Sequence, residues 1–392
     1  MSEKFYERIR NQLEEMKNAG KYKEYRYLES PMSAHSRIEK KGDVLVLCSN
    51  NYLGLSDKEE LVQSGIEALR KYGAGGASVR FICGTYDIHR DLENKVAEFL
   101  GTEAALTYVS CWNANTAVIP VLLQPGDTVI SDALNHASIV DGCRLIAKGV
   151  NKAIYKHSDM ADLEEKLKEA KDSPVRLVIT DGVFSMEGDI AKLPEIVELV
   201  RKYNAVLMMD DSHATGVIGG TGRGTAEYYN MQGQVDIITG TFGKALGGAG
   251  GGFVAGRKSL IDLCVQASRP HLFSNSLPPV LAATAKTALE YLTDHPEMVR
   301  SLREKTDYFR KQLKDRGLNI LEGDSAIIPI MIYDAPKAVR LANKLFEHGI
   351  YVTGFCYPVV PEGQARIRLQ VSDALSYEDI DRAADVIQKL VE

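Results

Sequence analysis

The chain has 392 residues, a formal net charge of −6 at pH 7 and 45% hydrophobic residues, which is typical of a folded protein of two or three domains. The acidic excess, 53 Asp and Glu against 47 Lys and Arg, argues against a protein that coats nucleic acid. No apolar run approaches the roughly 18 residues of a membrane span, and the first residues lack the apolar core of a signal peptide. The six cysteines are scattered without a C-x-x-C pair, which argues against a disulfide framework or a zinc ribbon. We therefore expect a soluble cytoplasmic protein without a nucleic-acid or membrane partner.

The N-terminal segment, residues 1–48, predicts a helix followed by a short strand. The apolar residues of the helix recur on one face: Phe5, Ile9, Leu13 and Met16. Gly20 is a suitable C-terminal stop for this helix. We expect the helix to pack on the body of the protein or on a partner subunit, and residues 43–47 to form the strand.

Residues 49–285 alternate between helical segments and short apolar runs. The runs include residues 104–108, 128–130, 176–180, 205–209, 236–239 and 252–255, and helices are predicted at 160–169 and 193–202. Apolar runs without in-and-out alternation indicate strands buried on both faces, and their alternation with helices indicates a mainly parallel sheet. The sequence therefore predicts a large α/β domain over residues 49–285.

The pattern changes near residues 280–290, where we place a domain boundary. Beyond it the predicted helices are 296–317, 337–347 and 377–391, and the predicted strands are 326–332, 350–353 and 365–371. Their alternation predicts a smaller C-terminal α+β domain over residues 286–392.

Chemically active side chains follow the apolar runs of the large domain. They are Ser131, Asp132, His136, Asp181, Ser185, Asp210, Asp211, His213, Thr241 and Lys244. In an open parallel sheet, ligands bind beyond the carboxyl ends of the strands, so these residues are expected to converge on one edge. Neither a phosphate loop nor a dinucleotide-binding glycine motif is present.

Lys244 and Asp210 have the chemistry that pyridoxal phosphate requires. A lysine among small and apolar residues has a lowered pKa and becomes a usable amine nucleophile. A carboxylate from a neighbouring strand can keep the pyridine nitrogen protonated. The strand-to-helix turns at Cys111-Trp112 and at residues 241–244 would supply hydroxyl and N–H groups for the phosphate.

Each of these residues also has an ordinary interpretation. Asp210 alone is more often a helix cap or turn residue, His136 a structural histidine and Lys244 a plain lysine. A metallohydrolase site of His136, Asp210 and His213 is a further alternative, although it leaves the lysine without a role. From the residues alone, pyridoxal phosphate and these alternatives all stay open.

Residues 239–252, around Lys244, resemble the lysine motif of the α-oxoamine synthases, which are pyridoxal-phosphate enzymes of fold type I. The resemblance continues through SNNYLGL at 49–55, SDALNHASIVDG at 131–142, TDGVFSMEGDIA at 180–191 and DDSHATG at 210–216. Within the family, residues 77–85, 269–279 and 351–368 favour the glycine C-acetyltransferase branch. The resemblance implies condensation of glycine with acetyl-CoA to 2-amino-3-ketobutyrate and CoA. The alternative inside the family is 8-amino-7-oxononanoate synthesis from alanine and pimeloyl-CoA.

The resemblance also implies roles for the residues that match the motifs. Lys244 would form the Schiff base with the cofactor and act as general base, Asp210 would pair with the pyridinium, and His136 would stack on the ring. His136 would also contact the substrate thioester. The remaining cofactor contacts would come from Ser185, His213, Thr241, Cys111 and Trp112. At Trp112 we expect a smaller aromatic residue in close relatives, which leaves its role open.

Substrate binding and the partner subunit complete the implied site. Arg368, with Asn50 nearby, would hold the substrate carboxylate, while Ser274 and Asn275 would serve the cofactor of the neighbouring subunit in a homodimer. Period two places Arg366 and Arg368 on one face of a strand, and a guanidinium grips a carboxylate bidentately. Without the resemblance, two solvated arginines on an edge strand would be the simpler interpretation. A non-catalytic dimeric scaffold of the same fold is the last alternative.

Overall fold

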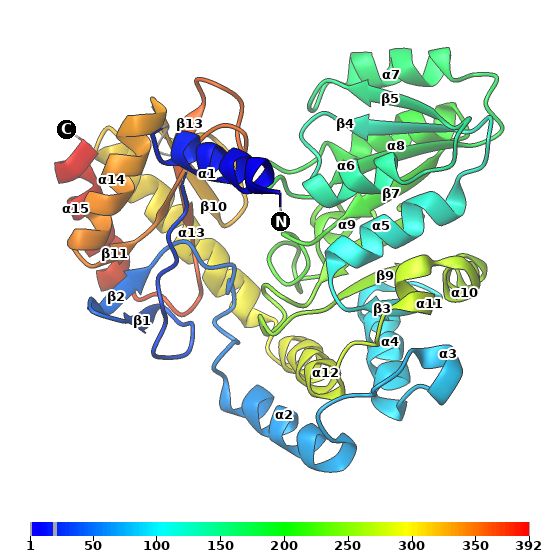
Figure 1. The fold of residues 1–392 in the computed structure, drawn as a ribbon, viewed down its shortest axis with the longest axis horizontal. Helices are drawn as coiled ribbons and strands as arrows, with labels where there is room; N and C mark the ends of the chain where they lie inside the picture. The colour runs from blue at the N-terminus through cyan, green and yellow to red at the C-terminus, as the bar shows by residue number, and fades with distance from the viewer. Residues whose placement is uncertain (1, 19–21, 392) are drawn as a thin grey trace.

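The computed structural model describes residues 2–18 and 22–391, and a seven-stranded sheet forms the centre of its larger part (Figure 1). The strand order is β3-β9-β8-β7-β6-β4-β5. The strands are β3 (Ala104–Tyr108), β4 (Thr128–Asp132), β5 (Asn151–Tyr155), β6 (Arg176–Asp181), β7 (Val206–Asp210), β8 (Ile237–Thr241) and β9 (Gly252–Gly256). Neighbours from β5 to β8 are parallel, whereas β9 is antiparallel to both β8 and β3. The predicted α/β fold with a mainly parallel sheet is confirmed.

One strand of this sheet, β5, is not among the strands that the sequence predicts. The central strands β6 and β7 are buried over nearly their whole length, so their apolar runs are continuous. By contrast, β5 lies at the sheet edge, and Asn151, Lys152 and Ile154 are exposed there. An edge strand of mixed polarity gives no apolar run, which is why it was missed.

Helices connect these strands and cover the sheet. They are α5 (Cys111–Leu122), α6 (Ala137–Arg144), α7 (Met160–Glu169), α8 (Leu193–Lys202), α9 (Thr225–Tyr228), α10 (Lys258–Ala267) and α11 (Arg269–Phe273). Helix α8 buries residues 193, 196, 197 and 200 at helical spacing, and each buried aliphatic side chain contributes about 1.5–3 kcal/mol. Among the helices that the structure describes, none is long and apolar enough to cross a membrane.

The smaller part of the molecule combines both ends of the chain (Figure 1). It contains the sheets β1-β2-β11 and β10-β13-β12. Its elements are β1 (His35–Ile38), β2 (Gly42–Val46), α13 (Glu297–Asp315), β10 (Ile327–Tyr333), α14 (Ala335–Glu347), β11 (Ile350–Tyr351), β12 (Thr353–Phe355), β13 (Ala365–Gln370) and α15 (Tyr377–Val391). Because β11 pairs in parallel with β2, the strands of the N-terminal segment complete the C-terminal part.

Four helices lie below the large sheet and at the junction of the two parts in Figure 1. They are α2 (Glu59–Tyr72), α3 (Arg80–Cys83), α4 (Asp87–Leu100) and α12 (Pro279–Asp294). Helix α12 packs against both α2 and α4. The domain boundary that we predict between residues 285 and 286 falls inside α12, and the division into domains stays a prediction.

Helix α1 (Glu3–Asn18) forms where the sequence predicts it, but no residue within these bounds is buried. Its apolar side chains Phe5, Leu13 and Met16 are exposed. Packing of this face on the body of the same chain is therefore not observed, and packing on a partner subunit stays a prediction. The predicted stop at Gly20 lies outside the described residues.

Candidate active site

Two adjoining cavities lie at the carboxyl ends of the parallel strands. The smaller, called here the lysine cavity, has a volume of about 190 Å³ and is lined by Cys111, Trp112, His136, Asp210, His213, Thr241 and Lys244 together with residues 110, 138, 181, 183 and 212. The larger, called here the arginine cavity, measures about 770 Å³, and its lining includes Asn50, His136, Ser185, His213, Lys244 and Arg368. Three side chains line both: His136, His213 and Lys244. Every predicted site residue except Ser274 and Asn275 thus lines one of these cavities.

Asp210 ends β7, and both of its carboxylate oxygens accept hydrogen bonds. Asn115 of α5 donates from Nδ2 to Oδ2 at 2.6 Å, and the backbone N–H of Ser212 donates to Oδ1 at 2.9 Å. Asn115 is itself fixed, because the hydroxyl of Thr239 donates to its Oδ1 at 2.8 Å. Since the carboxylate is buried and held by donors on two elements, its orientation in the lysine cavity is fixed.

Lys244 lies in the turn that follows β8, at the junction of the two cavities. Burial lowers the pKa of its amine, although the negative charge of Asp210 opposes that shift. The turn is fixed by Thr241, whose hydroxyl donates to the carbonyl of Gly251 at 3.0 Å and accepts from the N–H of Gly243 at 3.1 Å. A desolvated amine in a fixed turn suits both nucleophilic attack and proton abstraction.

The start of α5 approaches the start of β9 through backbone atoms. Ser110 caps the helix, accepting a hydrogen bond from the N–H of Asn113 at 3.2 Å. A side chain on Gly252 would lie only 2.2 Å from the backbone nitrogen of Cys111, so this close approach requires glycine. The N–H groups at a helix start attract anions, and those of α5 lie beside the lysine cavity.

His136 caps α6 and has a defined tautomer. Its Nδ1 accepts the backbone N–H of Ser138 at 3.2 Å and lies 2.7 Å from the hydroxyl oxygen of that serine. Burial lowers the pKa of His136, which favours the neutral ring, and a neutral ring that accepts at Nδ1 carries its hydrogen on Nε2. Trp112 lies edge-on to His136, with the ring centroids 6.0 Å apart. His136 can therefore offer an N–H donor to a ligand.

A hydrogen-bond chain through buried side chains connects His213 to Arg368, and both of these residues line the arginine cavity. Gln370 accepts from the Arg368 guanidinium at 3.0 Å and donates both to Asn50 and to the Tyr52 hydroxyl oxygen. The Tyr52 hydroxyl oxygen in turn lies at hydrogen-bond distance, 2.8 Å, from Nδ1 of His213. Burial holds the pKa of His213 well below its usual range. His213 is thus neutral.

The two arginines of β13 are buried, at 3% exposed for Arg366 and 8% for Arg368. Strand β13 is the middle strand of its sheet. The alternative of solvated arginines on an edge strand is therefore wrong. Arg368 donates to the carbonyl of Ser185 at 2.7 Å, while its Nε has no partner in the described part of the chain. A buried guanidinium N–H without a partner suits an anionic ligand.

Sequence reasoning missed Asn115, Ser138, Tyr52 and Gln370. Asn115 could have been found, because it lies four residues after Cys111 and therefore on the same face of α5. Tyr52 and Gln370 gave no local signal, since each becomes part of the site only through a partner more than 150 residues away.

Ser274 and Asn275 follow α11 and line neither of the two cavities. Asn275 is exposed and Ser274 half-buried. Phe273, Phe81 and Ile82 are also exposed in the segments around α3 and α11. The assignment of Ser274 and Asn275 to a neighbouring subunit stays a prediction.

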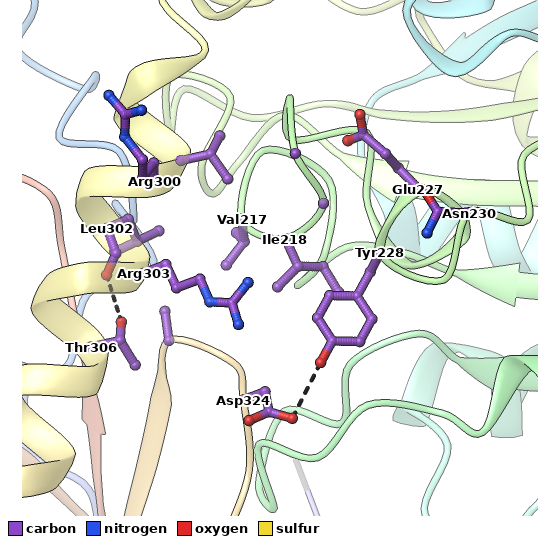
Figure 2. A pocket seen from close by; sticks show the side chains of 14 residues that line it. Val217, Ile218, Glu227, Tyr228, Asn230, Arg300, Leu302, Arg303, Thr306 and Asp324 are labelled. Atoms are coloured by element: carbon purple, nitrogen blue, oxygen red, sulfur yellow. Dashed lines mark hydrogen bonds between the residues drawn. The ribbon is translucent and has the colours of Figure 1, made fainter.

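The metallohydrolase alternative requires a cluster of metal-ligating side chains. Within residues 2–18 and 22–391, no group of three or more His, Cys, Asp or Glu side chains is placed to hold a metal ion, and His136, Asp210 and His213 do not form one. A separate cavity of about 610 Å³ lies between α13, α9 and the segment after β7. Figure 2 shows it with Arg303 pointing toward Tyr228, whose hydroxyl donates to Asp324 at 3.2 Å. No residue that we predict to be functional lines this cavity.

Comparison with known proteins identifies the family. Residues 42–387 match the model of the class I and II aminotransferases. The chain belongs to the class I and II aminotransferase family. Human mitochondrial 2-amino-3-ketobutyrate coenzyme A ligase is 48% identical to it, over 96% of this chain and 90% of the human protein. An 8-amino-7-oxononanoate synthase of Thermoanaerobacter pseudethanolicus is 46% identical, over 97% of this chain and 96% of its own length.

A solved structure shares the whole fold. It is a variant of serine palmitoyltransferase from S. paucimobilis with bound PLP-myriocin aldimine, at a TM-score of 0.92 and 29% identity. The match covers 100% of this chain and 98% of that one. The expected resemblance to the α-oxoamine synthases and the expected fold type are therefore confirmed.

Proposed function

We propose that the protein is a pyridoxal-phosphate-dependent acyltransferase that condenses glycine with acetyl-CoA to 2-amino-3-ketobutyrate and CoA. The observation that carries the proposal is the joint placement of Lys244, Asp210 and Arg368 around two adjoining cavities. The name of the human relative supports the same activity, and the solved serine palmitoyltransferase supports the cofactor.

The lysine cavity fits pyridoxal phosphate by the chemistry of its donor set. Lys244 supplies the amine for the Schiff base, Asp210 the buried carboxylate for the pyridinium, and His136 a ring to stack on the pyridine. Phosphate contacts would come from Thr241 and from the backbone N–H groups at the start of α5. Ser185 and His213 would hydrogen-bond near the ring oxygen. When bound, the cofactor supplies an electron sink for the carbanion formed at the glycine Cα.

The residues of the chain would then divide the remaining work. Arg368 would bind the glycine carboxylate, with Asn50 close by through Gln370. Lys244, whose pKa is lowered by burial, would remove a proton from the glycine Cα. His136 would donate a hydrogen bond from its Nε2–H to the thioester carbonyl oxygen of acetyl-CoA while the new carbon–carbon bond forms. The carbon–sulfur bond would break, and CoA would leave as the thiol, so that the proton taken from the glycine Cα by Lys244 balances the proton gained by the thiolate.

We propose a homodimer in which Ser274 and Asn275 complete the site of the neighbouring subunit. Exposed apolar side chains on the same segments, including Phe273 at 67%, support an interface there. Light scattering after size exclusion tests the mass, and a monomer would contradict this proposal. The cytoplasmic location also stays a proposal, for which the six free cysteines are the support.

The experiment that tests the function measures thiol release from acetyl-CoA and from pimeloyl-CoA, each with glycine and with alanine. We expect glycine with acetyl-CoA to be the best pair. The relative from Thermoanaerobacter pseudethanolicus favours a second candidate, 8-amino-7-oxononanoate synthesis, which predicts alanine with pimeloyl-CoA. No release from any pair would support the non-catalytic scaffold and overturn both proposals.

A further inference from the structure

We propose that His157 is a positioning residue for substrate binding: it clamps the loop whose backbone carbonyl holds the guanidinium of Arg368. The loop, called here the Ser185 loop, comprises residues 182–191 between β6 and α8. His157 lines neither cavity, so its effect on substrate would pass through the loop. The proposal rests on the proposed function in that Arg368 is taken to bind the glycine carboxylate.

His157 bridges two carboxylates that come from different parts of the chain. Its Nδ1 lies 3.0 Å from Oδ1 of Asp132 at the end of β4, and its Nε2 lies 3.1 Å from Oδ2 of Asp189 in the Ser185 loop. Because a carboxylate only accepts hydrogen bonds, both ring nitrogens must carry hydrogen, and the ring is a cation. Burial lowers the pKa of His157, but the hydrogen bonds and charges of Asp132 and Asp189 outweigh it and raise the pKa to about 10.

Asp132 is a rigid anchor for this bridge. It is buried at the end of β4, a strand paired on both sides within the large sheet. Its carboxylate also accepts the backbone N–H of Leu134 at 2.8 Å and that of Ser158 at 3.1 Å. His157 is therefore fixed to the sheet, and through its other nitrogen it fixes the loop.

His157 also touches the other end of the Ser185 loop. The ring of Phe184 lies edge-on to the imidazole, with centroids 4.4 Å apart. Phe184 and Asp189 are joined by a backbone hydrogen bond, from the N–H of Phe184 to the carbonyl of Asp189 at 3.0 Å. Since Val183 and Ile190 form a β-bridge, His157 holds both ends of a closed loop.

The tip of this closed loop holds the arginines of β13. The carbonyl of Ser185 accepts from Arg368 at 2.7 Å, and the carbonyl of Met186 accepts from Arg366 at 3.0 Å. Glu187 forms an ion pair with Arg366 at 3.1 Å. A shift of the loop tip would therefore displace the guanidinium of Arg368, and with it the Nε that has no partner within the described residues.

The test compares two amines that differ by a carboxylate. Protein loaded with pyridoxal phosphate is titrated with glycine and with methylamine, and the dissociation constants are read from the absorption change of the cofactor. For His157→Gln we expect the dissociation constant of glycine to rise about tenfold, since one hydrogen bond to a charged group is weakened. The dissociation constant of methylamine should stay within about twofold, because methylamine has no carboxylate for Arg368 to bind. A purely structural role would weaken both amines alike.

Two further variants keep the test decisive. His35→Gln is the matched control, because His35 also pairs with an aspartate, Asp379, at 2.9 Å but lies on β1 and lines neither cavity. It should leave both constants unchanged. If His157→Gln does not fold, Asp189→Asn carries the test, since it keeps the size of the side chain and removes only the charge.

The outcomes separate this inference from the proposed function. If the wild-type protein shows no preference for glycine over methylamine, the proposed role of Arg368 has failed, and the positioning role fails with it. If the wild-type protein prefers glycine and His157→Gln keeps the same preference, only the positioning role is overturned. An equal rise in the dissociation constants of glycine and methylamine in His157→Gln overturns the positioning role as well.

Discussion

The lysine cavity and the arginine cavity are built in different ways. The walls of the lysine cavity come from one edge of one sheet, and the buried carboxylate of Asp210 has donors on both oxygens. The arginine cavity joins both parts of the molecule, and the Nε of Arg368 has no hydrogen-bond partner in the described part of the chain. In the lysine cavity the carboxylate is already hydrogen-bonded on both oxygens before any substrate arrives, whereas in the arginine cavity one guanidinium N–H of Arg368 has no hydrogen-bond partner among the described residues. This difference matches a resident cofactor in one cavity and an exchanging substrate in the other.

The largest effect is expected from Lys244→Ala, which removes the amine that both cavities share. We expect the turnover number to fall by about 10⁴-fold, because nucleophile and base are lost together. The measurement is thiol release from acetyl-CoA with glycine. Borohydride reduction followed by mass spectrometry should find no cofactor adduct on the protein. Lys258→Ala, which removes a surface ion pair with Asp262, is the control. It should keep both the turnover number and the cofactor adduct.

Asp210→Ala tests whether the lysine cavity binds the cofactor. Removing one partner of a buried charge pair costs about 3–5 kcal/mol, so both cofactor affinity and rate should fall. The affinity for pyridoxal phosphate is measured by titrating the apoprotein. Asp210→Asn, which keeps the oxygen that Asn115 binds, should be less severe for affinity than Asp210→Ala. Normal cofactor affinity in both variants would place the pyridinium elsewhere.

Arg368→Lys tests the arginine cavity alone. Losing a bidentate hydrogen bond to a charged group costs about 1.5–3 kcal/mol, so the KM for glycine should rise about tenfold or more. Cofactor affinity should not change, because Arg368 does not line the lysine cavity. The matched variant Arg366→Lys, on the same face of β13 but paired with Glu187, should raise the KM less. An unchanged KM in Arg368→Lys would mean that another group holds the carboxylate.

The smallest effect is a shift in pH dependence from His136, which lines both cavities. Its pKa is lowered from 6.5 by burial, so the neutral ring persists to a more acidic pH than a free histidine would allow. Protonation of Nδ1 would break its hydrogen bond from the N–H of Ser138. The acid limb of kcat/KM for acetyl-CoA should therefore have its midpoint below pH 6.5, with more than half of the activity left at that pH. A midpoint above 6.5 would contradict the neutral assignment.

The same contrast explains what the sequence could predict. The strands of the large sheet are marked by continuous apolar runs, and the residues that follow parallel strands must share an edge. Asp210, His136 and Lys244 could therefore be grouped from the sequence alone. The edge strand β5 could not be found, because its mixed polarity gives no continuous apolar run.

Prediction was weaker where the site depends on contacts between distant segments. Burial of Arg366 and Arg368 follows from the position of β13 between β10 and β12, which no local pattern specifies. For the same reason Tyr52 and Gln370 were missed, since only tertiary packing joins them to His213 and Arg368. The motif resemblance, and not the periodicity, pointed to Arg368.

Gly252 has a consequence for how this protein can change over evolutionary time. Strand β9 and the start of α5 meet there through backbone atoms, at a distance that leaves no room for a side chain. The spacing between the start of β9 and the start of α5 is therefore set by contact between main-chain atoms. Neighbouring positions can drift in sequence while that spacing is preserved, provided that position 252 remains glycine.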